Sequence, residues 1–250
     1  MCFCSFLTMA PQTNEVGRSA VLLGGFAAIA HDTGLPLATL EIGASAGLNQ
    51  FWHRYRYALG DRAWGEPASP VLIRCDWRGA APALPTQIVV ASHRGCDIAP
   101  IDLNNPAAAL RLASYVWADQ QERRQRLAAA VALARQLGVP VEPADAAAWV
   151  AEHLSAARPG RATVLYHSIV WQYLPLDTRR QLRDTIEAAG ARATRAAPLA
   201  WLALELPDAS CLPQLTLTLW PGGEHRVLAD AHAHGLFATW LAAQQAEAER

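Results

Sequence analysis

The chain is organised around the ten residues Leu40-Glu41-Ile42-Gly43-Ala44-Ser45-Ala46-Gly47-Leu48-Asn49. They follow a short apolar run, residues 36–40, that is typical of a buried strand. They lead into an apolar spacing at positions 48, 51, 52 and 55 that is typical of one helix face. The glycines at 43 and 47 allow a sharp turn and leave backbone N–H groups open to a ligand. The stretch predicts a strand, a tight turn and a helix.

This stretch is compatible with three interpretations. Read as Glu-x-Gly-x-Ser-x-Gly, it is an acidic glycine-rich nucleotide loop in which Ser45 replaces a middle glycine. Read as Gly-x-Ser-x-Gly, it is the nucleophile elbow of a serine hydrolase. The third interpretation is a tight connection that binds nothing, because small residues at such turns also serve packing.

Composition narrows the class of protein. The 250 residues are 52% hydrophobic and 17% charged, which suffices for one large α/β domain. The net charge is −1, so no overall basic field draws the chain to nucleic acid or to an anionic membrane surface. We expect a small-molecule substrate and neither a nucleic acid nor a membrane partner. The composition does not indicate the oligomeric state.

Two residue types carry further information. All 21 basic side chains are arginine, so Schiff-base chemistry on lysine and the lysine of a phosphate-binding P-loop are both excluded. The five cysteines form no C-x-x-C pair, which indicates free thiols in a reducing cytosol. The longest apolar run, residues 20–30, is about half of what spans a bilayer. We expect a cytoplasmic protein.

Strands and helices alternate along the chain. Strands are predicted at residues 71–76, 139–145, 162–170 and 198–206, with a short apolar run at 88–90. Helices are predicted from Asn14 to about residue 30, from Asn105 to residue 136 with a break near 117–119, and from Asp177 to Gly190. Residues 214–220 and 226–231 flank Pro221-Gly222-Gly223-Glu224 and predict a hairpin. This order predicts a mostly parallel sheet with helices on both faces, a C-terminal antiparallel hairpin, and a ligand crevice at the carboxyl ends of the strands.

Acidic residues end several of these strands. Glu41, Asp76 and Asp145 suit a ligand that carries an amino group, ribose hydroxyls and an adenine amine. Asp76 lies roughly 30 residues past the turn, where roughly 20 is usual for a ribose-binding carboxylate, so an insertion has to account for the difference. An exposed turn position is the alternative for Asp76. Asp145 is also a predicted helix N-cap.

The hydrolase interpretation requires a serine, an acid and a histidine in chain order. That order is satisfied by Ser45, followed by Asp208 or Asp230, followed by His232 or His234. Only about 40 residues precede Ser45, however, and they contain no His-Gly-Gly oxyanion loop. Glu41 near the nucleophile would oppose formation of an oxyanion.

The nucleotide interpretation leads to a resemblance. The acidic loop, the strand ends and the hairpin resemble a class I S-adenosylmethionine-dependent methyltransferase. The segments 11–16, 40–49, 167–175 (His-Ser-Ile-Val-Trp-Gln-Tyr-Leu-Pro) and 219–223 (Leu-Trp-Pro-Gly-Gly) more closely resemble an uncharacterised bacterial family, domain of unknown function 2332. The resemblance implies a Rossmann-like α/β fold over residues 36–250, preceded by an N-terminal segment and helix over residues 1–35. Because that family begins with a longer helical part, residues 1–10 suggest a truncated or misassigned start.

The methyltransferase resemblance implies a set of cofactor contacts for S-adenosylmethionine. The methionine part would be held by Glu41, Gly43, Ala44, Ser45, Gly47 and Asn49. The ribose would be held by Asp76. Asp145 and Ala146 would contact the adenine, and His167 with Ser168 would line the floor beneath the sulfonium. No metal is implied, because His232 and His234 have no apparent third ligand.

Methyl transfer depends mainly on alignment of the acceptor with the sulfonium. His167 is our candidate catalytic base, with Tyr173 as a second candidate, and a histidine hydrogen-bonded within the sheet is the structural alternative. Trp171 and Gln172 are candidates for the substrate pocket, and core packing is the alternative for Trp171 and for Tyr173. A polar lid over the loop has the candidates Asn14, Glu15 and Arg18. Capping and a local Glu-Arg pair are the alternative for the last three. A protein that binds an adenosyl ligand without catalysis also remains open.

Overall fold

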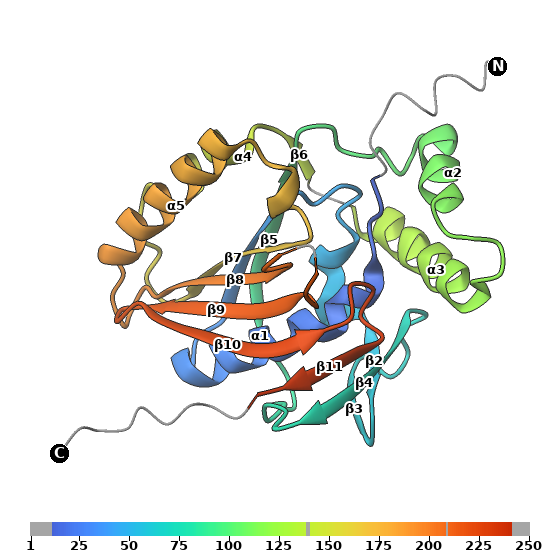
Figure 1. Ribbon diagram of the computed structural model, residues 1–250, viewed down its shortest axis with the longest axis horizontal. Helices are drawn as coiled ribbons and strands as arrows, with labels where there is room; N and C mark the ends of the chain where they lie inside the picture. The colour runs from blue at the N-terminus through green and yellow to red at the C-terminus, as the bar shows by residue number, and fades with distance from the viewer. Residues whose placement is uncertain (1–11, 139–140, 209, 242–250) are drawn as a thin grey trace.

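The computed structural model describes residues 12–138, 141–208 and 210–241, and these form one continuous eleven-stranded sheet flanked by helices (Figure 1). The strands are β1 (Leu37–Ile42), β2 (Arg56–Leu59), β3 (Arg62–Gly65), β4 (Leu72–Gly79), β5 (Val90–Asp97), β6 (Val141–Pro143), β7 (Ala162–Ser168), β8 (Leu199–Glu205), β9 (Gln214–Trp220), β10 (Glu224–Ala231) and β11 (Phe237–Trp240). The α-helices are α1 (Ser19–Thr33), α2 (Pro106–Ser114), α3 (Gln121–Leu137), α4 (Ala146–His153) and α5 (Leu176–Ala191). Short 3-10 helices occur at η2 (Val16–Arg18), η3 (Leu48–Arg54) and η4 (Trp171–Tyr173).

Five parallel strands form the half of the sheet that carries the glycine turn. Their spatial order is β6-β5-β1-β7-β8, and every neighbouring pair among them is parallel. If these five strands are numbered 1 to 5 in the order in which they occur along the chain, their order across the sheet is 3-2-1-4-5, which is the doubly wound Rossmann arrangement. The order reverses between β1 and β7, and a ligand crevice is expected outside the carboxyl ends at such a reversal. The predicted mixed α/β architecture with a mostly parallel sheet is confirmed.

The central strands form because their side chains are apolar on both faces. All six residues of β1 are buried, as are six of the seven residues of β7. Helix α1 covers one face, where Gly24 and Gly25 leave room for Trp240 and for Leu202 of β8. Helices α4 and α5 cover the other face and bury Trp149, Val150 and Leu182 among other side chains. Burial on both faces explains the near-continuous apolar pattern of these strands.

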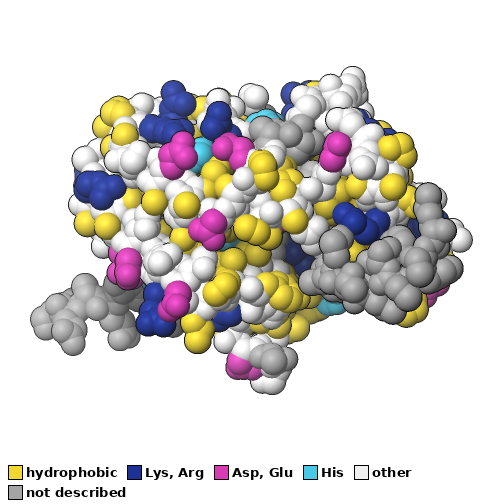
Figure 2. Space-filling model, turned by 90° about the horizontal axis from the view of Figure 1, so that it is seen from above, with side chains coloured by type: hydrophobic (Ala, Val, Ile, Leu, Met, Phe, Trp, Pro, Cys, Tyr) yellow, Lys and Arg dark blue, Asp and Glu magenta, His cyan; other side chains and the backbone are white. Residues whose placement is uncertain are grey.

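Helix α5 shows how an amphipathic sequence selects its face. Leu182 and Ile186 are buried, whereas the arginines of the helix lie toward solvent. Figure 2, a view from above Figure 1, shows basic side chains gathered on the side of the molecule that α5 occupies. Asp177 was predicted as its N-cap, but the helix begins one residue earlier, at Leu176 after Pro175, and Asp177 lies in the first turn.

The insertion after the glycine turn forms a separate part of the sheet. Strands β2, β3 and β4 lie at the edge far from β1, and β4 pairs in parallel with β11 at the end of the described chain. The strand predicted at 71–76 is therefore present, but it is not the neighbour of β1. That neighbour is β5, where only the short run at 88–90 was noticed. The strand β11 was not predicted.

The C-terminal hairpin and most helix limits agree with the sequence. Strands β9 and β10 pair antiparallel across the predicted turn. Asn105 caps α2 ahead of Pro106, the break between α2 and α3 occurs where it was predicted, and Gly34 ends α1 in a left-handed conformation. Asn14 does not cap α1, because η2 precedes that helix. Residues 1–11, which include the proposed truncated start, lie outside the described residues, as do positions 139 and 140 of the strand predicted at 139–145.

Within the described segments, no helix is both long enough and apolar enough to cross a bilayer.

Candidate functional site

The glycine turn, which we define as residues 43–47, joins β1 to η3 through three residues with positive φ. These are Gly43 (65°), Ser45 (54°) and Gly47 (71°). The Ala44 N–H donates to the Cys96 carbonyl at 2.9 Å, and the Gly47 N–H donates to the Ala44 carbonyl at 2.7 Å. The following helix is 3-10 instead of the expected α-helix. The turn therefore lies at the carboxyl end of β1, at the strand reversal.

Asp97, at the end of β5, is a carboxylate that bonds directly to this turn. One of its oxygens, Oδ2, accepts the Ser45 N–H at 2.8 Å, and the other, Oδ1, accepts the Ala99 N–H at 2.9 Å. Sequence analysis missed this residue because β5 reads Val-Ala-Ser-His-Arg-Gly-Cys-Asp, which is neither apolar nor alternating. The signal that could have found Asp97 is its place as the first acid after the weak 88–90 run.

Asp76 was predicted as the ribose ligand, and the structure places it elsewhere. It lies within β4, opposite Phe237 of β11, and its half-exposed carboxylate pairs with Arg78 at 2.6 Å. Five strands lie between β4 and β1 in the sheet order. The strand beside β1 is instead β5, which ends at Asp97.

Asp145 and Ala146 follow the end of β6, at the same edge of the sheet as the glycine turn. Strand β6 is the neighbour of β5, and the Ala144 N–H donates to the Asp97 carbonyl at 3.0 Å. The Asp145 carboxylate caps α4, as predicted, by accepting the N–H groups of Ala147 and Ala148 at 3.0 and 3.1 Å. The side chain is exposed, so one face of the carboxylate remains open to solvent.

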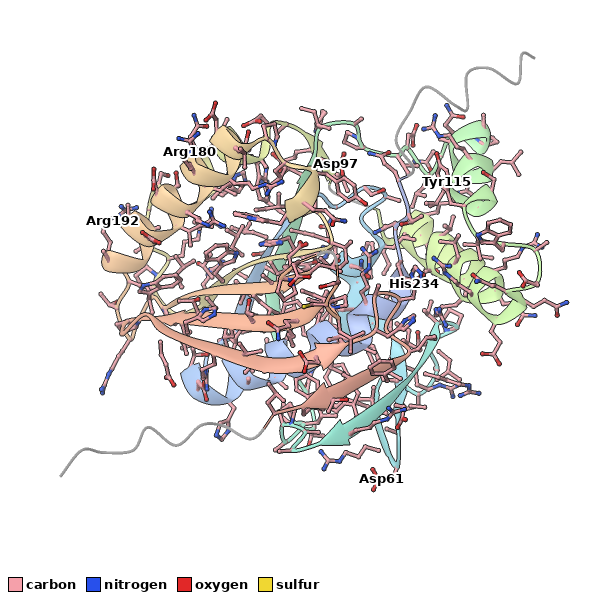
Figure 3. The ribbon with its side chains drawn as sticks, viewed as in Figure 1. Asp61, Asp97, Tyr115, Arg180, Arg192 and His234 are labelled. Atoms are coloured by element: carbon pink, nitrogen blue, oxygen red, sulfur yellow. The ribbon has the colours of Figure 1, made fainter. Side chains whose placement is uncertain are left out.

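Residues 12–18, which we call the strap, cross the carboxyl ends of three strands. Gln12 Nε2 donates to Asp97 Oδ1 at 3.2 Å, and Asn14 Oδ1 accepts the Leu48 N–H at 2.8 Å. Arg18 donates to the carbonyls of Ser168 and Ala233 at 3.1 and 2.9 Å. Figure 3 labels Asp97 and His234, between which the strap runs. The strap thus occupies the place of the predicted polar lid.

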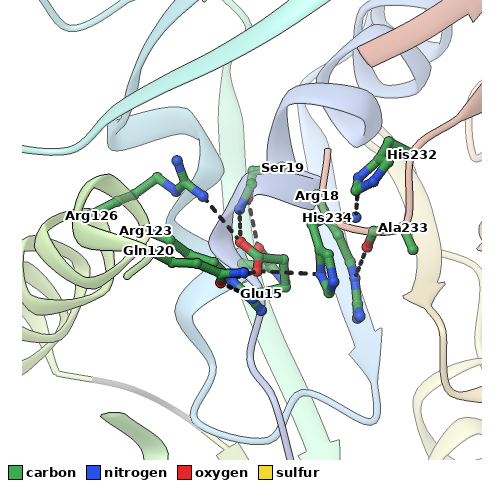
Figure 4. Close-up of polar contacts among 11 residues, drawn as sticks. Glu15, Arg18, Ser19, Gln120, Arg123, Arg126, His232, Ala233 and His234 are labelled. Carbon is green, nitrogen blue, oxygen red and sulfur yellow. Dashed lines mark hydrogen bonds and ion pairs between the residues drawn. The ribbon is translucent and has the colours of Figure 1, made fainter. Parts of the chain in front are cut away.

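Glu15 anchors the strap through an almost fully buried ion-pair cluster (Figure 4). Its carboxylate pairs with Arg123 and with Arg126 of α3, the latter at 3.4 Å, and with His234 at 3.5 Å. It also accepts the Gly17 N–H at 3.0 Å, which caps η2. Burial alone would raise the pKa of Glu15, but Arg123, the Gly17 N–H and Arg126 outweigh burial and hold that pKa below its ordinary value. The local pair of Glu15 with Arg18 is not the ion pair found here; Arg123 and Arg126 of α3 are the partners of Glu15.

Glu41 lies beneath the turn, within the core. It is 2% exposed, and its Oε2 accepts the Tyr166 hydroxyl at 3.1 Å across the β1–β7 pair. Burial, followed by the charge of Asp97, raises the pKa of Glu41 to about 8 despite the hydroxyl donor. At neutral pH this side chain is therefore mainly a carboxylic acid. Nearby, the Ser19 hydroxyl donates to Asn49 Oδ1 at 2.7 Å, so Asn49 also serves the buried network.

His167 has both ring nitrogens engaged. Trp201 Nε1 can only donate, so the His167 Nε2, at 3.0 Å, is the acceptor. The proton is then on Nδ1, which donates to Glu205 Oε1 at 2.7 Å. The ring is 1% exposed and stacks on Trp171 with a centroid separation of 5.1 Å. This arrangement is the hydrogen-bonded structural alternative, and it leaves His167 no nitrogen with which to act as a base.

Glu205 also holds the loop that follows β7, which we define as the Ser168 loop, residues 168–171. The same Oε1 accepts the N–H groups of Val170 and Trp171 at 3.0 and 3.2 Å. Within this loop Ile169 has φ of 52°, a conformation that is rare for a β-branched residue. Ser45 and Ile169 are the two non-glycine residues with positive φ in the described chain, and they follow β1 and β7, the strands on either side of the reversal. Strained residues of this kind cluster at functional sites.

The Ser168 loop lies directly against the glycine turn. A Cβ placed on Gly43 would collide with the Val170 side chain, so Val170 occupies the space above that glycine. Ser168 and Trp171 are half-buried, whereas Gln172 and Tyr173 are exposed, Tyr173 by 71%. The turn is therefore covered by Val170, Asn14 and Asp97.

Ser45 does not have the surroundings of a hydrolase nucleophile. Its positive φ suits a strained elbow, but its Oγ is buried and has no hydrogen-bond partner among the described residues. The Asp97 carboxylate bonds to its N–H, and no histidine contacts its hydroxyl in the described chain. The His232 and His234 rings have their centroids 5.5 Å apart and are tilted by 54°, and the described residues contain no group of three or more metal-ligating side chains.

The strand order and the strained acidic glycine turn define this chain as a Rossmann-like α/β protein with a candidate ligand site at its strand reversal. The sequence profile of a bacterial family described as "Uncharacterized protein conserved in bacteria (DUF2332)" matches residues 3–240. The chain belongs to this family, as the sequence resemblance indicated. No curated protein and no solved structure matches the chain.

The close contact between Gly43 and Val170 yields a prediction about stability. Gly43→Ala should cost about 2–4 kcal/mol of unfolding free energy, because it adds a collision with Val170 to the strain of positive φ. Gly34→Ala is the matched control, since Gly34 has the same φ of 65° but open space around it, and it should cost about 1 kcal/mol. Urea denaturation measures both. Equal losses in the two variants would contradict the contact, and Val170→Ala should recover part of the loss in a Gly43→Ala background.

The raised pKa of Glu41 predicts how stability depends on pH. Between about 4.5 and 8 the folded state holds a proton on Glu41 that the unfolded state releases, so the free energy of unfolding falls as pH rises through this window. The full effect is roughly 5 kcal/mol at most. Glu41→Gln should flatten this slope, whereas the control Glu66→Gln, at an exposed position, should leave it unchanged. Denaturation series from pH 4 to pH 9 (roughly the range over which Glu41 titrates) provide the measurement.

Proposed function

We propose that this chain binds S-adenosylmethionine at the glycine turn and transfers its methyl group to a small-molecule acceptor. The observation that carries the proposal is the acidic glycine-rich turn at the carboxyl end of β1, at the reversal of a 3-2-1-4-5 sheet. Ligands of doubly wound proteins bind outside the strands at this point.

The donor set around the turn suits the polar groups of this cofactor. Asp97 takes the ribose role that the sequence gave to Asp76, because it ends the strand next to β1. Asp145 and Ala146, at the end of β6, are suited to the adenine amine and ring. The buried Ser45 hydroxyl, which has no partner in the described part of the chain, offers a further hydrogen bond. Glu41 acts from below by supporting the turn.

Binding requires two side chains to move. Val170 lies over Gly43, and Asn14 holds the Leu48 N–H at the start of η3. The Val170 side chain belongs to the Ser168 loop and the Asn14 side chain belongs to the strap. Neither residue is part of a strand, so rotation about their side-chain bonds would uncover the turn without disturbing the sheet. We propose that cofactor binding displaces Val170 and Asn14.

The residues present favour catalysis by alignment. When bound, S-adenosylmethionine supplies an activated methyl group. His167 serves a positioning role in this proposal, because with Glu205 it fixes the Ser168 loop. Tyr173 remains the candidate for contact with the acceptor, since its exposed ring follows that loop. An acceptor that is already nucleophilic needs no base.

The alternative function is binding of an adenosyl ligand without catalysis. Two observations favour it: His167 has no free nitrogen, and the strap covers the turn. A protein of this kind would bind the cofactor and its demethylated product but turn neither over.

Isothermal titration of the purified chain with S-adenosylhomocysteine tests the proposal. We expect one site per chain, and at about one hundred times the dissociation constant a rise in melting temperature of roughly 5–10 °C. Asp97→Asn should weaken binding about tenfold or more, because it removes the charge that would accept the ribose hydroxyls. The matched control Asp102→Asn, five positions further along the same connection, should bind like the parent.

A folded protein that binds neither S-adenosylmethionine nor S-adenosylhomocysteine would remove both the methyltransferase proposal and its alternative. Binding without release of S-adenosylhomocysteine in the presence of acceptor mixtures would favour the non-catalytic function. Labelling of Ser45 by a fluorophosphonate would instead support a hydrolase.

A further inference from the structure

The buried cluster around Glu15 contains more positive than negative charge. Three guanidinium groups meet there, those of Arg18, Arg123 and Arg126, with side chains that are between 7% and 15% exposed. The carboxylates that face them are Glu15 and Glu205. The cluster therefore carries one uncompensated positive charge, and a second whenever His234 is protonated.

An excess of buried charge is unfavourable unless a partner neutralises it. Burial lowers the pKa of Arg18, and Arg123 lowers it further, while Glu15 and Glu205 only partly offset these effects. Backbone carbonyls take two of its donor nitrogens, at Ser168 and Ala233. The dipole of a backbone carbonyl stabilises the Arg18 guanidinium but does not cancel its charge.

Two exposed side chains border the cluster. The His234 side chain is 44% exposed and its Nδ1 lies 3.5 Å from the Glu15 carboxylate, and Tyr173, which is 71% exposed, follows the Ser168 loop to which Arg18 bonds. A cavity of about 10 Å³ lined by Asn14, Arg123 and Arg126 has room for roughly one water molecule. An anion larger than a single atom would therefore approach past His234 and Tyr173.

We propose that this cluster binds a carboxylate group of the acceptor substrate. A carboxylate carries the single negative charge that the cluster lacks, and its two oxygens match the donor fork of arginine. The site lies beside the Ser168 loop, since Arg18 bonds to the Ser168 carbonyl, so a bound carboxylate would hold the rest of the acceptor near the glycine turn. The assignment of the anion to an acceptor rests on the proposed function, whereas anion binding itself does not.

Titration with benzoate, with benzamide as its neutral counterpart, tests the inference in the absence of any cofactor. We expect saturable benzoate binding at constant ionic strength, seen by calorimetry and by a rise in melting temperature, and none for benzamide. Arg126→Gln should weaken benzoate binding about tenfold or more. His234→Gln should weaken it at about pH 5 more than at about pH 8, because burial and Arg123 lower the pKa of His234 and its ring is protonated only toward the acidic end. Arg124→Gln, two positions away on the exposed side of α3, is the matched control.

The groups that face His234 are Glu15, Arg18, Arg123 and His232, so the pH comparison is repeated in His232→Gln, which should retain the difference. Equal binding of benzoate and benzamide, no binding of benzoate, or an equal loss in Arg124→Gln would each overturn the inference. Stronger binding of inorganic phosphate than of benzoate would also overturn it in favour of a phosphate site. The same variants are also titrated with S-adenosylhomocysteine. Loss of benzoate binding with S-adenosylhomocysteine binding retained concerns the anion site alone, whereas absence of S-adenosylhomocysteine binding concerns the proposed function.

Discussion

The reversal of strand order between β1 and β7 is the constraint on which the rest of the structure depends. Neighbouring parallel strands normally send their connections to the same side, but at a reversal the two connections diverge to opposite faces. The glycine turn after β1 leads toward η3, and the Ser168 loop after β7 leads toward α5. The backbone must bend sharply at both places, which is where the left-handed Ser45 and Ile169 occur.

Two carboxylates hold these bends in place, and both come from the next strand outward. Asp97 of β5 accepts the Ser45 N–H, and Glu205 of β8 accepts two N–H groups of the Ser168 loop together with His167. Each carboxylate satisfies backbone donors that the bend removes from the sheet ladder, and an unsatisfied donor would be costly there. The candidate site is therefore a pair of strained loops clamped from both sides, with the strap laid across them.

Local pattern was sufficient for elements whose signal lies in neighbouring residues. Strands β1, β7 and β8, the hairpin β9–β10 and the capped start of α2 follow from apolar runs, turn residues and the Asn105-Pro106 pair. It was insufficient where position depends on partners far along the chain. Asp76 was placed beside β1 because its strand comes next in sequence, but the pairing of β4 with β11 over some 160 residues decides its location. Likewise, the pairing of His167 with Glu205 and Trp201 depends on the register of β7 against β8.

The pairing of β4 with β11 also affects how the chain acquires its structure during synthesis. The ribbon β2–β4 is complete by Gly79, yet the strand that covers the β4 edge ends at Trp240. An uncovered strand edge is a template for association with other chains, and domains are made from the N-terminus onward. The exposed charges along β4, at Arg74, Asp76 and Arg78, are of the kind that discourages such association until β11 is made.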